Sequence, residues 1–201
     1  IPAGLFLGII SAVKPRSLID YLSTIFSSYT ISVPVYVSSI FLIFIFSLKL
    51  GWFPTGGFEG PKTWIMPVIA YGLSPSGIIA RYTRSSMVEV LNEPYIVTAK
   101  SKGLPLWYVI IQHAFRNAMI PILTIMFPMF TRIVTGSIFI ERIFRIPGLG
   151  GYFVTSIYQR DYPLMMTLMI LIAVLLGLTY LFIDVLYTII DPRIQLWRRE
   201  L

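Results

Sequence analysis

The chain has 201 residues, of which 56% are hydrophobic and only 12% are charged, with a formal net charge of +7. A soluble domain usually carries about twice that charged fraction, so the composition excludes an ordinary soluble protein and predicts an integral membrane protein. The positive charge is explained by basic cytoplasmic loops that meet anionic membrane lipid, and not by a nucleic-acid partner. The absence of cysteine and the single histidine exclude disulfides, thiolate metal sites and multi-histidine metal centres.

Apolar runs predict the membrane spans. The first run, residues 1–13, is too short to cross a bilayer, which takes about 20 residues, so we expect it to be the end of a helix that begins before this sequence. Four full spans are predicted over residues 25–50, 64–80, 118–140 and 164–190. Runs of this length must be helical in lipid, because every backbone polar group needs an internal partner. The sequence therefore predicts an all-α, polytopic helix bundle that forms one transmembrane domain over residues 1–201.

Proline and glycine interrupt several of these spans, most densely residues 64–80. Ordinary kinking and close helix packing explain most such residues, but their density here also favours a helix that lines a transport pathway. Polar residues in this span and in 118–140 are candidate pathway groups, although serine and threonine often bond only to their own helix. The candidates are Ser74, Ser76, Thr131, Arg132 and Thr135.

The lysine and arginine residues orient the spans, because cytoplasmic loops carry an excess of them. One set of loops holds Lys14, Arg16, Arg81, Arg84, Lys100, Lys102, Arg116, Arg193, Arg198 and Arg199. The other holds Lys49, Lys62, Arg132, Arg142, Arg145 and Arg160. The first set is larger, so we expect it, and the C-terminus, to be cytoplasmic.

The one long cytoplasmic segment, residues 81–117, has helix signals of its own. Asn92-Glu93-Pro94 is a helix start, Gly103 is a natural helix end, and Pro105 begins a second helix. One face of the first helix would present Tyr95, Thr98, Ala99 and Lys102. The pattern fits two alternatives equally: an amphipathic helix pair on the lipid headgroups, or a docking site for a cytoplasmic partner.

Several motifs favour the docking site, because their order and spacing resemble a known family. They are Arg81-x-x-Arg84-Ser85-Ser86-Met87-x-Glu89-Val90, Tyr95-x-x-Thr98-Ala99-x-x-Lys102-Gly103-Leu104, His113-x-x-Arg116-Asn117-Ala118-x-x-Pro121, Phe144-x-Ile146-Pro147-Gly148-Leu149-Gly150, Arg160-Asp161-Tyr162-Pro163 and Asp191-Pro192-Arg193. This series resembles the permease subunits of ATP-driven importers of the dipeptide, oligopeptide and nickel class, and the His-x-x-Arg-Asn-Ala form resembles the first of their two permeases. The general importer loop has an acid and two alanines where this chain has Val97, Thr98 and Ala99.

The resemblance implies the type I importer permease fold, with four full transmembrane helices, the end of a fifth, and a cytoplasmic coupling-helix loop. It implies a multi-pass protein of the cell membrane whose partners are a second, homologous permease, two ATPase subunits and an extracytoplasmic substrate-binding protein. Coupling to the ATPase would fall to Tyr95, Thr98, Ala99, Lys100, Lys102, Gly103 and Leu104. The cargo would be di- or oligopeptides, although nickel and glutathione are carried by related permeases.

The chain contains no phosphate-binding loop of the Gly-x-x-x-x-Gly-Lys-Ser/Thr type. We therefore expect no catalytic activity and no cofactor on this chain, with ATP and magnesium held by the partner ATPases. His113 is expected to pack or to form hydrogen bonds. Asp184, an acid within an apolar run, is either a functional group or a helix-end ion pair. The alternative function is an ion-coupled secondary carrier that acts without an ATPase; a membrane hydrolase lacks the Ser–His pair or histidine cluster that it would need.

Charged residues on the predicted outer side form a further candidate group. They are Glu141, Arg142, Arg145, Arg160 and Asp161. They would either dock the binding protein or form local ion pairs of little energy at loop ends.

Overall fold

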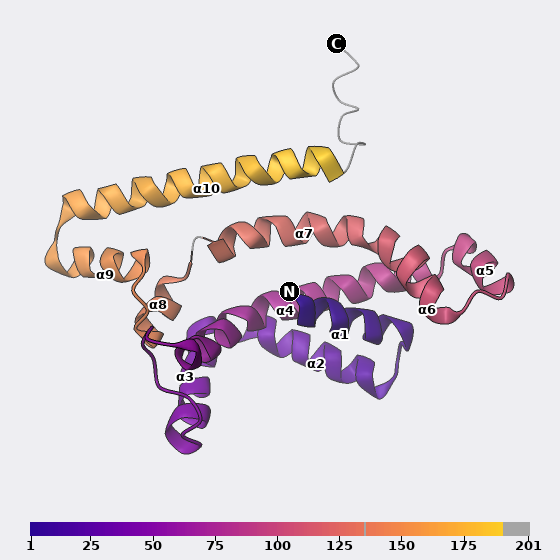
Figure 1. The fold of residues 1–201 in the computed structure, drawn as a ribbon, viewed down its shortest axis with the longest axis horizontal. Coiled ribbons are helices and arrows are strands. Elements are labelled where there is room, and N and C mark those ends of the chain that lie inside the picture. Colours follow the sequence, from indigo (N-terminus) through magenta and orange to yellow (C-terminus); the bar gives the residue numbers. More distant parts are fainter. Residues whose placement is uncertain (135, 191–201) are drawn as a thin grey trace, which may run out of the picture. The chain divides into compact units, whose positions relative to one another are not determined.

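The computed structural model describes residues 1–134 and 136–190, and every regular element in these ranges is a helix (Figure 1). The predicted all-α class is confirmed. The described residues form two compact units. The first contains residues 1–55 and 59–126, and the second contains residues 56–58 and the chain from Phe127 onward.

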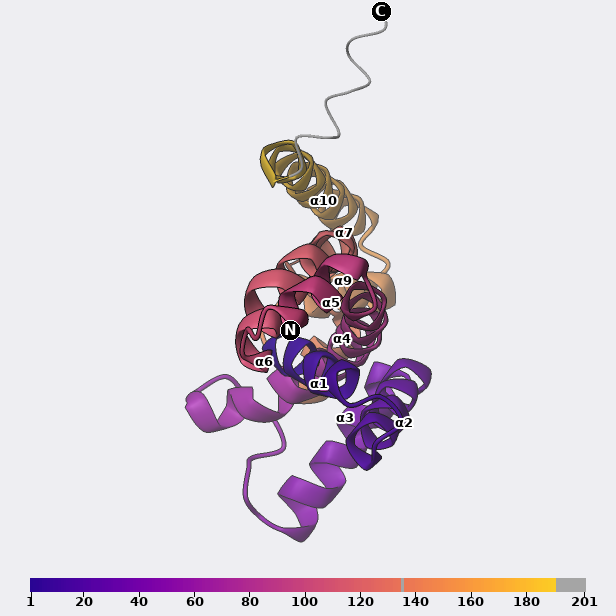
Figure 2. The same cartoon turned by 90° about the vertical axis from the view of Figure 1, so that its right-hand side faces the viewer.

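Three helices of the first unit pack side by side. They are α1 (Pro2–Val13), α2 (Leu18–Ser32) and α4 (Pro61–Leu91). Both α1 and α2 contact α4, and they also contact each other (Figures 1 and 2). The helix α4 is therefore the centre of this unit.

Small residues allow α1 to approach α4 closely. A Cβ atom added at Gly8 would lie 2.5 Å from the Cβ of Thr83 and 2.7 Å from the carbonyl oxygen of Ala80. Gly4, one turn earlier, lies in the same way against the carbonyl oxygen of Ser76. In lipid, helices associate through such close backbone contact, because no hydrophobic effect drives apolar helices together there.

We expect Gly8→Ala to destabilise the protein by about 1–3 kcal/mol, the usual cost of an extra methyl group in a filled contact. Gly72→Ala is the matched control, since nothing lies within 4 Å of a Cβ added at Gly72 in α4; it should be neutral or slightly stabilising, because alanine is the better helix former. Thermal unfolding of the purified protein in detergent compares the two. Equal stability of both variants would contradict the close packing of α1 on α4.

The span predicted over residues 25–50 is not one continuous helix but is broken at Pro34. The chain instead forms α2 and a second helix, α3 (Val35–Leu42), which continues as the π-helical segment Ile43–Lys49, and the two parts are bent by 108°. The physical cause is Pro34, which has no N–H to donate and disfavours a helical conformation in the residue before it. The span also begins earlier than predicted, at Leu18, because the Ser17 hydroxyl accepts a hydrogen bond from the Asp20 N–H at 3.3 Å and caps the helix.

The predicted loop over residues 81–117 is also longer than the observed one. The helix α4 has 31 residues and is about 46 Å long at about 1.5 Å per residue, so it extends past a hydrocarbon core of about 30 Å. Residues 106–130 form another long apolar helix, in which α6 (Leu106–Tyr108), the π-helical segment Val109–Phe115 and the start of α7 (Arg116–Val134) follow without a break. The connection between the two long helices is therefore residues 92–105, which contain the short helix α5 (Pro94–Ser101). We call residues 92–105 the α5 loop.

The second unit contains α8 (Ile138–Phe144), α9 (Leu149–Gln159) and α10 (Tyr162–Ile190). The helix α9 contacts both α8 and α10. The Gly57 N–H donates a hydrogen bond of 2.7 Å to the Phe144 carbonyl, which places residues 56–58 in this unit. The single span predicted over residues 118–140 differs from the structure, in which α7 ends at Val134 and α8 starts at Ile138. The helix α10 covers the whole of the predicted span over residues 164–190.

Among the residues that the structure describes, three helices are long and apolar enough to cross a membrane, namely Pro61–Leu91, Leu106–Phe130 and Tyr162–Ile183, and the bent pair α2–α3 would make a fourth span.

Candidate functional site: the α5 loop and its anchoring

The α5 loop owes its shape to proline and glycine. Pro94 stands in the first turn of α5, where its missing N–H costs no hydrogen bond. The loop turns at Gly103, whose φ of +75° is a conformation that glycine adopts without strain. No atom lies within 4 Å of a Cβ added there, so the backbone angle and not lack of space requires glycine.

An apolar base holds α5 against the ends of the long helices. Ile96 and Ala99 point inward and are buried, and Ala99 is only 7% exposed. They share one core cluster with Ala12, Met87, Val109, Ala114, Ala118 and Ile122. Leu104 packs at the edge of the same cluster. A force applied to α5 would therefore reach α4 and the helix that follows the loop.

Two hydrogen bonds reinforce this base. The Asn117 side-chain amide donates to the Tyr95 hydroxyl at 2.9 Å, and so joins α5 to the start of α7. The Ser86 hydroxyl donates to the Ala118 carbonyl at 3.1 Å, and so joins α4 to α7. The loop is thus fixed at its base by both apolar and polar contacts.

The opposite face of α5 is exposed. Tyr95, Val97, Thr98, Lys100 and Lys102 are all exposed, and Val97 is 57% exposed. The structure therefore brings most of the predicted coupling residues onto one accessible surface, which we call the α5 outer face. Ala99 differs from the expectation, because it faces the apolar base and cannot belong to a docking surface. The reason is that Ile96 and Ala99, three residues apart, form the apolar side of this short helix.

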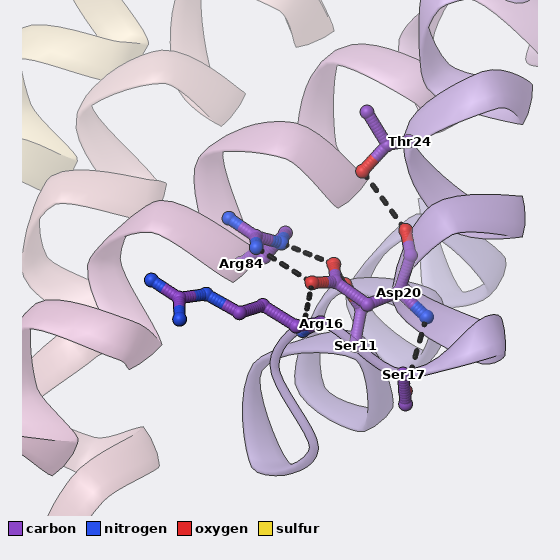
Figure 3. Close-up of polar contacts among 6 residues, drawn as sticks. All are labelled: Ser11, Arg16, Ser17, Asp20, Thr24 and Arg84. Atoms are coloured by element: carbon purple, nitrogen blue, oxygen red, sulfur yellow. Dashed lines mark hydrogen bonds and ion pairs between the residues drawn. The ribbon is translucent and has the colours of Figure 1, made fainter.

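An ion pair between the buried Asp20 and the partly exposed Arg84 anchors the turn between α1 and α2 to α4 (Figure 3). Asp20 is only 4% exposed, and Arg84 binds both of its carboxylate oxygens, with Nη2 2.7 Å from Oδ2. The Ser11 hydroxyl donates to Oδ1 at 2.9 Å and the Arg16 N–H donates to Oδ2 at 2.8 Å. With four donors the carboxylate is well satisfied, which a buried charge requires.

Sequence reasoning did not identify Asp20 as a site residue. Its span was predicted to start at Ile25, which left Asp20 in a loop, and Arg84 was considered only for membrane orientation and as part of a family motif. An acid in the first turn of an apolar helix is rare enough in membrane segments to have been singled out. Its partner, 64 residues away, could not be found without the structure.

The pathway candidates are not gathered into one site by the residues that the structure describes. The Ser76 hydroxyl donates to the Gly72 carbonyl of its own helix, and Ser76 is buried where α1 meets α4. Ser74 is half-buried on the same helix. Thr131 and Arg132 lie in α7, but their side chains, like Thr135 and the side chain of Asp184, lie outside the described residues.

Glu141, from the predicted outer cluster, has a local structural role. Its Oε2 accepts a 2.7 Å hydrogen bond from the Gly150 N–H, and the glycines of the Pro147-Gly148-Leu149-Gly150 turn lie against its carboxylate. Asp161 accepts from the Leu164 N–H at 3.1 Å at the start of α10. Arg145 and Arg160 adopt φ of +55° and +56° at the ends of α8 and α9. These features favour local structural roles for the charged residues over a role in docking the binding protein.

We expect Gly150→Ala to destabilise the protein by about 1–3 kcal/mol through overpacking, because the added Cβ would lie 2.7 Å from the Ile138 Cα and 2.9 Å from the Glu141 carboxylate. Gly151→Ala is the adjacent control, as nothing lies within 4 Å of a Cβ there. Thermal unfolding in detergent measures both. A Gly150→Ala protein as stable as the control would contradict the packing around Glu141.

His113 lies in the π-helical segment, with its ring centre 5.7 Å from that of Tyr108. Within the described ranges, no three His, Cys, Asp or Glu side chains come together as a metal site would need.

Comparison with known proteins agrees with these features. Residues 4–196 match the family model of the binding-protein-dependent transport system inner membrane component. The chain is 42% identical over 197 residues to the dipeptide transport system permease protein DppB of Bacillus subtilis (strain 168), covering 98% of this chain and 64% of the relative. It is 40% identical over 194 residues to the oligopeptide transport system permease protein OppB of Salmonella typhimurium, covering 96% of this chain and 63% of that relative.

The chain therefore belongs to the family of inner-membrane components of binding-protein-dependent transport systems, and it is a multi-pass membrane protein. It spans somewhat less than two thirds of the length of the curated relatives that it matches.

Proposed function

We propose that this chain is a permease subunit of an ATP-driven, binding-protein-dependent importer for dipeptides or oligopeptides. The observation that carries the proposal is the α5 loop, a short helix with an exposed face and an apolar base on the ends of two long apolar helices. Family membership and relatives whose names refer to dipeptide and oligopeptide transport support the same conclusion.

In this proposal the α5 outer face docks on an ATPase subunit in the cytoplasm. Movement of the ATPase pair would push α5, and the buried contacts of Ile96 and Ala99 would pass the displacement to the helices on which they rest. A docking element needs an accessible surface and a rigid base, and α5 has both. The loop and the C-terminus would then be cytoplasmic, in line with the distribution of lysine and arginine.

The chain would not be catalytic itself. ATP and magnesium would be held by two ATPase subunits, because this sequence has no phosphate-binding loop. A second, homologous permease would complete the transport path, and an extracytoplasmic binding protein would deliver the peptide.

Copurification tests this proposal. The tagged protein is extracted from its native membrane in mild detergent, and the accompanying proteins are identified by mass spectrometry. We expect an ATPase and a second permease in stoichiometric amounts. Recovery of the chain alone, or only as a homo-oligomer, would contradict the importer and favour an ion-coupled carrier.

A further inference from the structure

A small polar pocket lies between α2 and α4, beside the Asp20–Arg84 pair. It has a volume of about 200 Å³, and all of its lining residues except Ala80 carry a hydroxyl or guanidinium group. Ser23, Thr24 and Ser27 line it from α2, and Arg81, Arg84 and Ser85 line it from α4. Arg81 and Ser85 are exposed at the mouth of the pocket, and the hydroxyls of its buried serines need a hydrogen-bond partner from water or from a bound ligand.

Two of the lining serines are buried residues, and their hydroxyls, which face the pocket, form no hydrogen bond in the part of the chain that the structure describes. Ser23 is 4% exposed and Ser27 is 2% exposed, and both line the pocket. Thr24 differs from them, because its hydroxyl donates to the Asp20 carbonyl at 2.9 Å. The pocket therefore offers two unused donors, the Ser23 and Ser27 hydroxyls.

The pocket also carries an excess positive charge. The Arg84 guanidinium is neutralised by Asp20. The Arg81 guanidinium donates to the Ser28 hydroxyl at 3.0 Å, and it has no carboxylate partner among the described residues. One uncompensated arginine beside free hydroxyls suits an anion with a single charge and several acceptor oxygens, and arginine with hydroxyl donors is a common phosphate-binding combination.

The surroundings of the pocket indicate where such an anion comes from. Both lining helices expose large apolar side chains close to the pocket residues, including Leu22 and Ile25 on α2 and Tyr82 on α4. An anion that is attached to acyl chains would place those chains on this apolar surface. Arg81 and Arg84 belong to the set of basic residues that we expect at the cytoplasmic face, where anionic lipid is concentrated.

We propose that the pocket between α2 and α4 binds a singly charged phosphodiester, the group that an anionic phospholipid carries in its headgroup. The phosphate oxygens would accept from the Arg81 guanidinium and from the Ser23 and Ser27 hydroxyls. This site is distinct from the α5 outer face and does not depend on what the protein transports. A phosphodiester bound in this pocket would link α2 to α4 next to the Asp20–Arg84 pair.

The test uses the protein purified with whatever subunits accompany it and reconstituted in nanodiscs of phosphatidylcholine with or without phosphatidylglycerol. Native mass spectrometry counts the lipids retained after release from the disc, and a titration with inorganic phosphate in phosphatidylcholine discs tests the soluble source. We expect retained phosphatidylglycerol in preference to phosphatidylcholine. Arg81→Gln should weaken this retention about tenfold and Ser23→Ala about fivefold, as loss of a charged and of a neutral hydrogen bond predicts.

Lys14→Gln is the matched control, because it removes one exposed charge from the same end of the first unit without lining the pocket; its lipid retention should be unchanged. Displacement of phosphatidylglycerol by inorganic phosphate would support the site, and so would phosphate binding to the unmodified protein but not to Arg81→Gln. Either result would show that the site also accepts a soluble phosphate. Equal retention of both lipids without any effect of phosphate would overturn the proposal. So would a loss in Lys14→Gln as large as the loss in Arg81→Gln.

Discussion

Replacement of Val97 by glutamate is expected to reduce peptide uptake strongly while the protein remains folded and inserted. Val97 is the most exposed apolar residue of α5 and lies in the middle of the α5 outer face. An added charge costs nothing in the free protein, because the side chain stays in water. In the docked complex the same carboxylate would be buried without a partner, which typically costs several kcal/mol. We expect uptake in proteoliposomes to fall by at least about tenfold, the equivalent of about 1.4 kcal/mol.

Ala99→Glu separates docking from folding. Ala99 is buried in the apolar base, so the glutamate would disrupt the protein itself, and we expect a lower folded yield and a lower unfolding temperature. The Val97→Glu protein should unfold at the temperature of the unmodified protein. Normal uptake by a well-inserted Val97→Glu protein would contradict a docking role for the α5 outer face.

Arg84→Gln is expected to destabilise the protein by about 3 kcal/mol, because it leaves Asp20 charged and buried without its counter-ion. This value lies at the low end for a broken buried pair. Arg84 is partly exposed, and Ser11 and Arg16 still donate to the carboxylate. Thermal or denaturant unfolding of the purified protein in detergent measures the change.

The double variant Asp20→Asn with Arg84→Gln is the control for this effect. It removes both charges and keeps polar side chains of similar size, so it should recover a large part of the lost stability. A double variant as unstable as the sum of the two single changes would show that the two residues are not coupled. That result would contradict the role of the ion pair in holding the α1–α2 turn on α4.

The sequence predicted the helical class and the identity of the long helices, because apolar runs in lipid leave the backbone no alternative to a helix. It did not predict their ends. Pro34 lies within the predicted span over residues 25–50, but a proline can kink or break a helix, and only the structure shows a bend of 108°. The continuation of α4 through residues 81–91 was missed for a different reason. Those residues are mixed in polarity and resemble a loop, but Thr83, Ser86 and Met87 among them are buried.

The candidate site was predicted in part. Pro94 and Gly103 indicated a short helix and its turn, since both residues restrict the backbone locally. The orientation of that helix was not predictable, because eight residues hold only two full turns, and Ala99 fits either face by pattern. The Asp20–Arg84 pair and the contact between Tyr95 and Asn117 join residues far apart in the sequence, and such pairs depend on the packing of the helices.

The most direct test of the central claim, that α5 docks on an ATPase, is site-specific cross-linking from Val97. The chain contains no cysteine, so Val97→Cys provides a single attachment point for a short maleimide photo-cross-linker in native membranes. Val68→Cys is the control, since Val68 is also exposed but lies within the apolar part of α4. We predict that the cross-linker at position 97 captures an ATPase subunit, that ATP changes the yield, and that position 68 captures none. Capture of lipid alone at position 97, in membranes that contain the ATPase, would contradict the account.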